Sequence, residues 1–251
     1  MSRVKLGDVA REYKATIKNH NLPIVGLEHL TPGEINLDRW EEGVENTFTK
    51  GFKKGQMLFG RRRAYLKKAA LAPFDGVCSG DITVIEAIPE KLNPELLPFI
   101  IQNDMLFDFA VGNSAGSLSP RVKWEHLKEY EFELPELSQQ NKLVEILNAA
   151  YATKRAYQKQ IAATEDLVKS QFIEMFSNET NCQKLCDCAY IEKGKTITRD
   201  EVVEGNIPVV AAGIEPSCYH NKSNRDAGII TVSASGANAG YVNYWDIPIF
   251  A

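Results

Sequence analysis

The sequence predicts an α+β protein. It consists of a globular mixed α/β domain at residues 1–136, a long coiled-coil-type helix at 137–178, and the start of a second, similar α/β domain at 179–251. Three observations predict this organisation. Short β-rich runs alternate with Gly and Pro in the first part, a long stretch without either residue follows, and motifs of the first part recur in the last.

The first region has the pattern of a mixed α/β module. Residues 82–85 (ITVI) and 132–134 (FEL) are short β-rich runs bounded by turn-forming residues. Leu66 and residues 69–71 (AAL) are also typical of strand core. These runs predict several short strands in a compact domain.

A long helix follows. From Ser138 to Phe176 the chain contains no Gly or Pro, with Ser138 as the expected N-cap and Asn178 as the expected stop. Its apolar residues follow a 3,4 spacing typical of a helix that packs against one partner helix. This predicted seam consists of Leu143, Leu147, Ala150, Tyr157, Ile161, Val168 and Met175. The alternative is an ordinary long core helix.

The last region repeats the first. Residues 5–10 (KLGDVA) match residues 184–189 (KLCDCA), and residues 22–25 (LPIV) have a counterpart in 207–210 (IPVV). Two matches in the same order indicate a duplicated module. The second copy reaches the apolar residues 247–251 (IPIFA) with no second long helix, so we expect a shortened second domain.

Composition excludes several classes of protein. The 251 residues are 44% hydrophobic and 25% charged, which is typical of globular domains, and no apolar run is long enough to span a membrane. Five cysteines, an odd and low number, indicate a reducing cytoplasm. A net charge of −4 excludes a uniformly basic nucleic-acid binder, but it does not exclude a local basic patch.

One such patch lies between residues 50 and 68, which contain eight basic residues and no acidic one. Arginine presents a fork that matches phosphate oxygens or the guanine edge, and lysine supplies a mobile charge, so the patch suggests nucleic-acid contact. The alternative is a solvated strand-turn-strand face that is balanced by acids such as Glu41, Glu42 and Glu45.

Catalytic and metal sites find little support in the sequence. Residues 233–240 (SASGANAG) lack the features of a P-loop or a nucleophile elbow and predict a tight turn or a close backbone approach to a ligand. Cys182, Cys186, Cys188, Cys218 and His220 do not have zinc-knuckle spacing. No methyltransferase motif is present either. We therefore expect no catalytic residue, no metal and no cofactor.

The order of these segments resembles the specificity (S) subunit of type I restriction-modification systems. The resemblance rests on residues 5–10, 52–68 (FKKGQMLFGRRRAYLKK), 74–81 (FDGVCSGD) and 120–124 (PRVKW), and in the second region on 207–213 (IPVVAAG) and 230–242 (ITVSASGANAGYV). It implies a non-catalytic DNA-reading scaffold with two target-recognition domains, each reading one half of a split sequence. Modification subunits that methylate adenine with S-adenosylmethionine and a restriction subunit would dock on it.

The candidate DNA contacts lie on three segments of the chain. They are Lys53, Lys54, Arg61, Arg62, Arg63, Tyr65, Lys67 and Lys68 in the basic patch, Ser117 and Arg121 on a polar loop, and Lys222, Asn224 and Arg225 in the second region. Tyr65 is expected to pack beneath the cations, and Lys67 or Lys68 can instead be structural.

Two further hypotheses concern assembly. The helical seam at residues 138–176 lacks a partner helix within the chain, so we expect it to pair with a second copy. The rival function is an assembly scaffold, or a silent cassette product, that does not read DNA; salt-dependent DNA binding separates the two.

Overall fold

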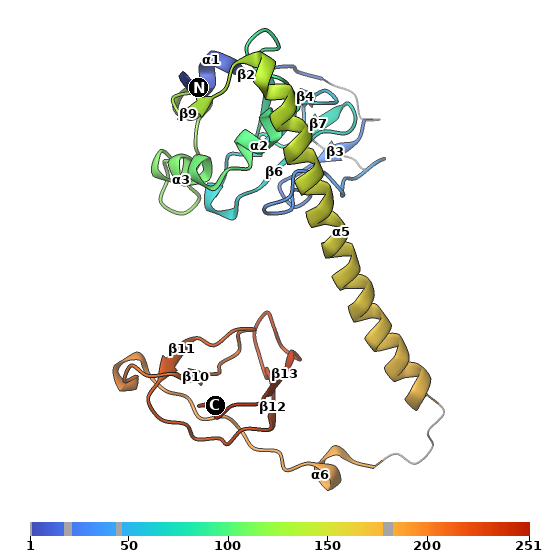
Figure 1. Cartoon of the computed structure of the whole chain (residues 1–251), viewed down its shortest axis with the longest axis vertical. Helices are drawn as coiled ribbons and strands as arrows, with labels where there is room; N and C mark the ends of the chain where they lie inside the picture. The colour runs from blue at the N-terminus through green and yellow to red at the C-terminus, as the bar shows by residue number, and fades with distance from the viewer. Residues whose placement is uncertain (1, 18–21, 44–46, 178–182) are drawn as a thin grey trace. The chain divides into compact units, whose positions relative to one another are not determined.

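The computed structural model describes residues 2–17, 22–43, 47–177 and 183–251. The chain divides into two compact units, residues 1–170 and 171–251. The predicted α+β class is confirmed, with several small sheets and one long helix (Figure 1).

The first unit contains three small sheets. Its strands are β1 (Ser2–Lys5), β2 (Ala10–Glu12), β3 (Ile24–Val25), β4 (Lys50–Phe52), β5 (Met57–Gly60), β6 (Ala69–Leu71), β7 (Gly76–Cys78), β8 (Ile82–Ala87) and β9 (Glu131–Leu134). The order β2-β8-β5-β6 forms an antiparallel sheet, β3-β7-β4 forms a mixed sheet, and β1 pairs with β9. The predicted strands at 82–85, 132–134 and 69–71 are present, whereas Leu66 lies in a short 3-10 helix, η1 (Ala64–Leu66).

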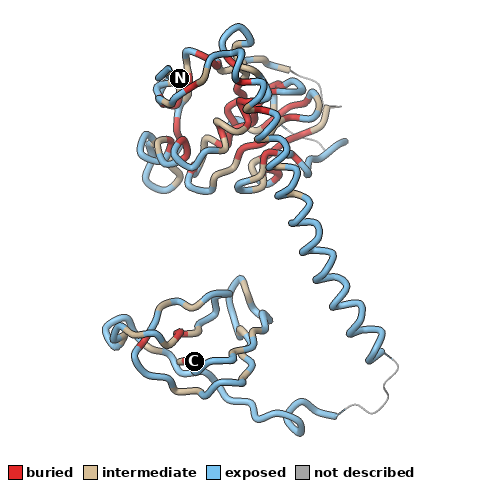
Figure 2. The backbone as a smooth tube through the Cα atoms, in the orientation of Figure 1, coloured by how far each residue is buried: buried red, intermediate tan, exposed pale blue. Residues whose placement is uncertain are grey.

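Alternation along β5 divides the core into two apolar clusters. Met57 and Phe59 belong to one cluster, and Leu58, between them in sequence, belongs to the other. The helices α1 (Leu6–Val9), α2 (Leu97–Ile101), α3 (Asp104–Gly112) and α4 (Trp124–Leu127) contribute side chains to the first cluster. Figure 2 shows that the buried residues concentrate in this unit.

The long helix α5 (Leu137–Phe176) has 40 residues, about 60 Å at 1.5 Å per residue. It begins one residue before Ser138, so the predicted N-cap lies inside the first turn. The expected stop, Asn178, falls outside the described residues. Val144 is buried in the first cluster, and Leu143 and Leu147 pack against it.

Past its first turns, α5 is held to the first unit by polar contacts. The Tyr151 hydroxyl accepts hydrogen bonds from the backbone N–H of Ile35 (3.0 Å) and Asn36 (3.3 Å) and donates one to Glu34 (3.0 Å). Arg155 pairs with Asp38 at 2.8 Å. The first half of the helix therefore docks on the first unit rather than on another helix.

The second unit contains α6 (Leu185–Cys188), η2 (Arg199–Glu201), β10 (Ile207–Val209), β11 (Cys218–His220), β12 (Ile229–Val232) and β13 (Val242–Trp245). β10 pairs with β11, and β12 pairs with β13. The matched segments 5–10 and 184–189 adopt the same local structure, one helical turn between extended residues. Few of its described residues are buried (Figure 2); they are Pro208, Val209, His220 and Ile249.

Candidate nucleic-acid interface

The hairpin that joins β5 to β6 carries most of the predicted basic patch. Strand β5 ends at Gly60, and its loop continues with Arg61, Arg62 and Arg63 before η1. The backbone N–H of Arg61 donates to the Asp81 carbonyl at 3.0 Å, so the loop starts beside the turn that precedes β8. The Nε of Arg61 is buried and has no hydrogen-bond partner among the described residues.

The structure joins this hairpin to the second predicted surface, the polar loop that ends at Arg121. Arg62 and Arg121 form an isolated antiparallel bridge, and the Arg63 N–H donates to the Pro120 carbonyl at 2.8 Å. The Nε of Arg62 also donates to the Ser119 hydroxyl at 2.9 Å. Two segments about 60 positions apart in the sequence therefore form one surface.

Asp81 lies at the centre of this surface. Its carboxylate accepts a hydrogen bond from Arg121 Nε at 2.7 Å and from Arg62 Nη1 at 3.4 Å. The hydrogen bond from Arg121, followed by the charges of Arg121 and Arg62, holds the pKa of Asp81 below its ordinary value despite partial burial. Asp81 fixes the two guanidinium groups in place. We refer to Arg61, Arg62, Arg63, Arg121 and Asp81 as the arginine cluster.

Asp81 ends the motif at residues 74–81, and the sequence predicts no role for its side chain. The sequence pattern that could have identified Asp81 is Ser79-Gly80, a turn-forming pair directly before a buried strand. A polar side chain in such a turn lies at the edge of the sheet. Which cations it meets depends on strand pairing between distant segments.

The other predicted residues of the first unit divide into different environments. Lys53 and Lys54 are exposed in the β4–β5 turn, at the opposite end of β5 from the arginine cluster. Tyr65, on η1, is 54% exposed, which contradicts the expectation that it packs beneath the cations. Ser117 is exposed on the loop before Arg121.

Two lysines of the hairpin have structural partners. Lys67 Nζ lies 2.6 Å from an Asp104 carboxylate oxygen at the start of α3. Lys68 Nζ donates to the Leu27 carbonyl at 2.8 Å and is partly buried, as the structural alternative for these lysines anticipated. The arginines are therefore the principal cations of the interface.

The cluster predicted in the second unit is not a uniformly exposed loop. Asn224 holds Ala251 through its side-chain amide, since Nδ2 donates to the Ala251 carbonyl and Oδ1 accepts from the Ala251 N–H, each at 2.8 Å. Arg225 pairs with Glu192 at 2.8 Å and bridges to Ile249. Lys222 remains exposed. Asn224 and Arg225 therefore hold neighbouring segments of the chain together, which corrects their assignment to an exposed polar loop.

No metal centre is formed among the described residues, where no three His, Cys, Asp or Glu side chains gather closely enough to bind one. Cys182 lies outside that part of the chain. His220 Nδ1 accepts a hydrogen bond from the Val203 N–H at 3.0 Å, and its ring packs edge-on to Phe250. These contacts give His220 a structural role.

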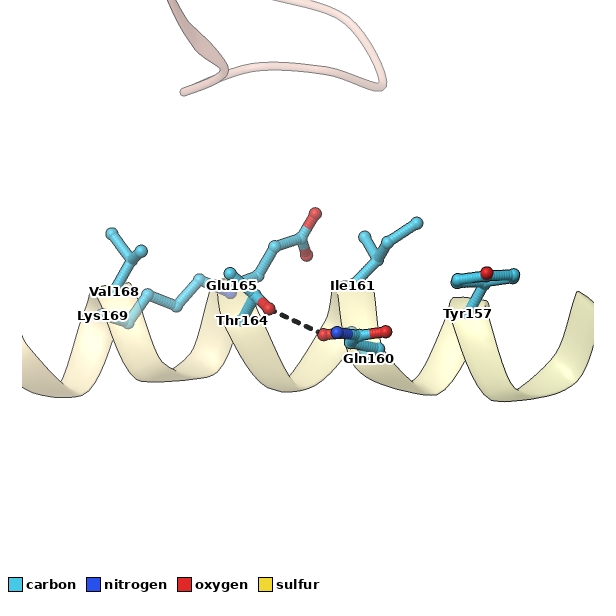
Figure 3. A pocket seen from close by; sticks show the side chains of 7 residues that line it. All are labelled: Tyr157, Gln160, Ile161, Thr164, Glu165, Val168 and Lys169. Carbon is cyan, nitrogen blue, oxygen red and sulfur yellow. Dashed lines mark hydrogen bonds between the residues drawn. The ribbon is translucent and has the colours of Figure 1, made fainter.

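The predicted seam on α5 divides into two parts. Leu143 and Leu147 face the first unit, whereas Ala150 and all later seam residues are exposed. Figure 3 shows that Tyr157, Ile161 and Val168 project from the same side of the helix. Each is at least 60% exposed, as is Met175 further along. The far half of α5 thus presents apolar side chains to solvent.

The fold and this surface define a class of protein: an α+β module with a clustered cationic face, mounted on a spacer-length helix and followed by a second, related unit. The family described as the type I restriction modification DNA specificity domain matches residues 2–164. The chain belongs to this family.

Individual relatives agree with this family membership. The chain is 23% identical over 186 residues to the type I restriction enzyme EcoDI specificity subunit of Escherichia coli, and the match covers 71% of this chain and 41% of that protein. The chain therefore spans less than half the length of this curated relative.

Solved structures show the fold. The type I S subunit from M. genitalium superposes with a TM-score of 0.55 at 15% identity, covering 99% of this chain and 69% of that one. The HsdS subunit from Thermoanaerobacter tengcongensis gives 0.53 at 18% identity, covering 99% and 72%. None of the helices in the described residues is long and apolar enough to cross a membrane.

Proposed function

We propose that this chain is a sequence-reading subunit of a type I restriction-modification complex and that the arginine cluster of its first unit contacts double-stranded DNA. The observation that carries the proposal is the joining of two separate basic segments around Asp81. The guanidinium groups of Arg62 and Arg121 bind the Asp81 carboxylate, and Arg61 and Arg63 lie on the same hairpin, so four arginines against one aspartate leave a local positive excess on a protein of net charge −4. Such a local excess attracts phosphates and releases counterions when DNA binds.

The proposed complex follows the family. The chain reads part of a split DNA target and carries out no chemistry itself, while modification subunits methylate and a restriction subunit cleaves. Its proposed location is the cytoplasm. Cys186 and Cys188 are free and exposed, which is consistent with a reducing compartment.

We further propose that the exposed face of α5 pairs with a second helix, and in the isolated protein with the same helix of another copy. Seven large apolar side chains beyond residue 160 are more than half exposed, which is unusual for a helix without a partner. Five of them, Ile161, Val168, Phe172, Met175 and Phe176, lie on one side of the helix, and Leu167 and Ile173 flank that side. An antiparallel pair would set the distance between two DNA-reading units.

Light scattering tests the pairing. The expected result is a mass of twice 28.0 kDa at micromolar concentration, reduced to one chain by Ile161→Asp with Val168→Asp. A wild-type protein that stays at the mass of one chain contradicts the pairing.

DNA binding is tested by fluorescence anisotropy with a labelled duplex of about 30 base pairs, titrated between about 50 and 200 mM NaCl. We expect affinity to fall steeply with salt. Arg62→Ala and Arg121→Ala should each reduce the salt slope by about one ion. The control Lys169→Ala removes an equal charge from an exposed position on α5 and should leave the slope unchanged.

Asp81→Asn should change the salt slope of DNA binding in the opposite direction. It releases Arg62 and Arg121 from their carboxylate, so the salt slope should steepen. Asp75→Asn is the matched control, because Asp75 accepts a hydrogen bond from the Lys54 N–H and contacts no arginine of the cluster. Salt-independent binding of the wild-type protein contradicts the DNA proposal and favours the assembly scaffold, for which the exposed α5 is the supporting feature.

A further inference from the structure

The two units contain hairpins whose loops have the same length. β5 pairs with β6 up to Phe59 and Ala69, and β12 pairs with β13 up to Val232 and Val242. Beyond these pairs, the Gly60 N–H donates to the Lys68 carbonyl at 2.8 Å, and the Ser233 N–H donates to the Tyr241 carbonyl at 2.9 Å. Each hairpin therefore closes around seven residues, 61–67 in the first unit and 234–240 in the second.

The two loops have residues of positive φ at the same two positions. Arg63 and Lys67 have φ angles of 54° and 51°, and the residues at the equivalent positions, Gly236 and Gly240, have φ angles of 85° and 87°. Among the described residues, Arg63 and Lys67 are the non-glycine residues in the left-handed region. A side chain is strained there, whereas glycine is not.

The second unit therefore shows that glycine can occupy both positive-φ positions of a hairpin loop of this length. The first unit instead holds cationic side chains at both strained positions. Strain that glycine would relieve is characteristic of positions whose side chain has a function.

Lys67 has a structural use for its side chain, the ion pair with Asp104. Arg63 has none in the described part of the chain, where its exposed guanidinium forms no hydrogen bond and no ion pair. Its backbone is nevertheless fixed, because its N–H bonds to Pro120 and its carbonyl accepts from the Leu66 N–H at 2.9 Å. Arg63 thus combines an unpaired guanidinium, among the described residues, with a backbone that hydrogen bonds hold in place.

We propose that Arg63 is the specificity-determining residue of the first unit and that its guanidinium reads the edge of a guanine in the major groove. This inference rests on the proposed DNA-binding function. A phosphate contact tolerates a mobile cation, since phosphates recur along the whole duplex and carry no sequence. Bidentate contact with guanine O6 and N7 requires a guanidinium in one position, which a fixed backbone provides.

The test compares Arg63→Gly and Arg63→Ala in the full chain. Both variants remove the guanidinium, but only glycine removes the strain, so Arg63→Gly should melt at a higher temperature than Arg63→Ala. Lys169→Ala is the charge-matched control, because Lys169 is an exposed cation on α5 and is not among the candidate DNA contacts.

The DNA probe is a library of duplexes with a randomised central segment, selected by each protein and sequenced. We expect the wild type and Lys169→Ala to enrich a motif containing one particular G·C pair. Both Arg63 variants should lose that preference by about tenfold or more and keep their preferences elsewhere in the motif.

The inference is overturned if the Arg63 variants keep the preference, if they weaken binding equally for all sequences, or if the wild type binds without enriching a motif. Failure of the proposed DNA-binding function would give a different result from failure of the Arg63 inference. In that case the wild-type protein shows no salt-dependent binding to any duplex of the library.

Discussion

Replacing Tyr151 with phenylalanine should loosen the docking of α5 on the first unit. The hydroxyl is the shared partner of two backbone donors, Ile35 and Asn36, and of the Glu34 carboxylate. Phenylalanine keeps the ring and its edge contact with Phe99. The substitution therefore removes the hydrogen bonds without creating a large cavity.

The magnitude follows from these contacts. Ile35 is 7% exposed, so water has little access to its N–H once the hydroxyl is gone. Leaving a buried donor unsatisfied costs about 1–3 kcal/mol, and we expect a loss of about 2 kcal/mol in the free energy of unfolding. For a unit of this size, that loss corresponds to a decrease in Tm of roughly 4–8 °C.

Urea unfolding followed by circular dichroism, together with calorimetry, measures the change. Tyr157→Phe is the matched control, because it removes the same atom from an exposed tyrosine on the same helix. Its free energy of unfolding should stay within about 0.5 kcal/mol of wild type. Equal losses in both variants, or no loss at Tyr151, would refute the docking role of the hydroxyl.

Glu34 adds a pH dependence to this contact. Burial opposes its ionisation, but hydrogen bonds from Gln158, Lys154 and Tyr151 outweigh burial and hold its pKa below the ordinary value of 4.5. The ionised form therefore stabilises the fold above about pH 4.5, and this stabilisation is lost as pH falls through the lowered pKa. Tyr151→Phe should make that loss shallower, and an unchanged pH profile would argue against the coupling.

Two further predictions concern burial. Val144→Ala should lower the free energy of unfolding in urea by about 2 kcal/mol, because Val144 is buried in the core. Val168 is 65% exposed, so Val168→Ala should change the stability of the single chain by less than about 0.5 kcal/mol. Similar losses at both positions would contradict this assignment of core and surface. Cys78 should resist alkylation in the folded protein, because its burial raises the pKa of the thiol to about 12, while Cys186 should react readily. Mass spectrometry after timed iodoacetamide treatment compares the two, and rapid labelling of Cys78 would be incompatible with the fold.

The long helix was predictable because it depends on local properties. A run without Gly or Pro and with many strong helix formers gives a helix whatever surrounds it. What the helix packs against depends on residues far away in the sequence. Periodicity predicted one continuous seam, but Leu143 and Leu147 face the first unit because β9 leads directly into α5 beside its core.

The candidate site was predictable in composition and not in arrangement. Charge density identified the arginines, since charge is a property of the sequence. Strand β5, four residues or about 13 Å of extended chain, then lies between Lys54 and Arg61 and divides the predicted patch between the two ends of a sheet. The pairing with Arg121 and the anchor at Asp81 exist only once the strands are in register.

The second unit shows the same division between sequence and tertiary structure. Its duplication was visible in residues 184–189, but its hairpin shares only Gly228 and Ala237 with the equivalent positions of the first unit, Gly55 and Ala64. Backbone hydrogen bonds and φ angles define a hairpin loop, and many side chains are compatible with them.

The sequence by itself determined the fold class, the spacer helix, the repeat and the cationic character of the first unit, because propensity, hydrophobic period and charge are local. Only the tertiary structure decided which cations are neutralised, which arginine stays free, and which face of α5 is covered. Each of these depends on contacts between residues that strand pairing and core packing bring together from distant parts of the chain.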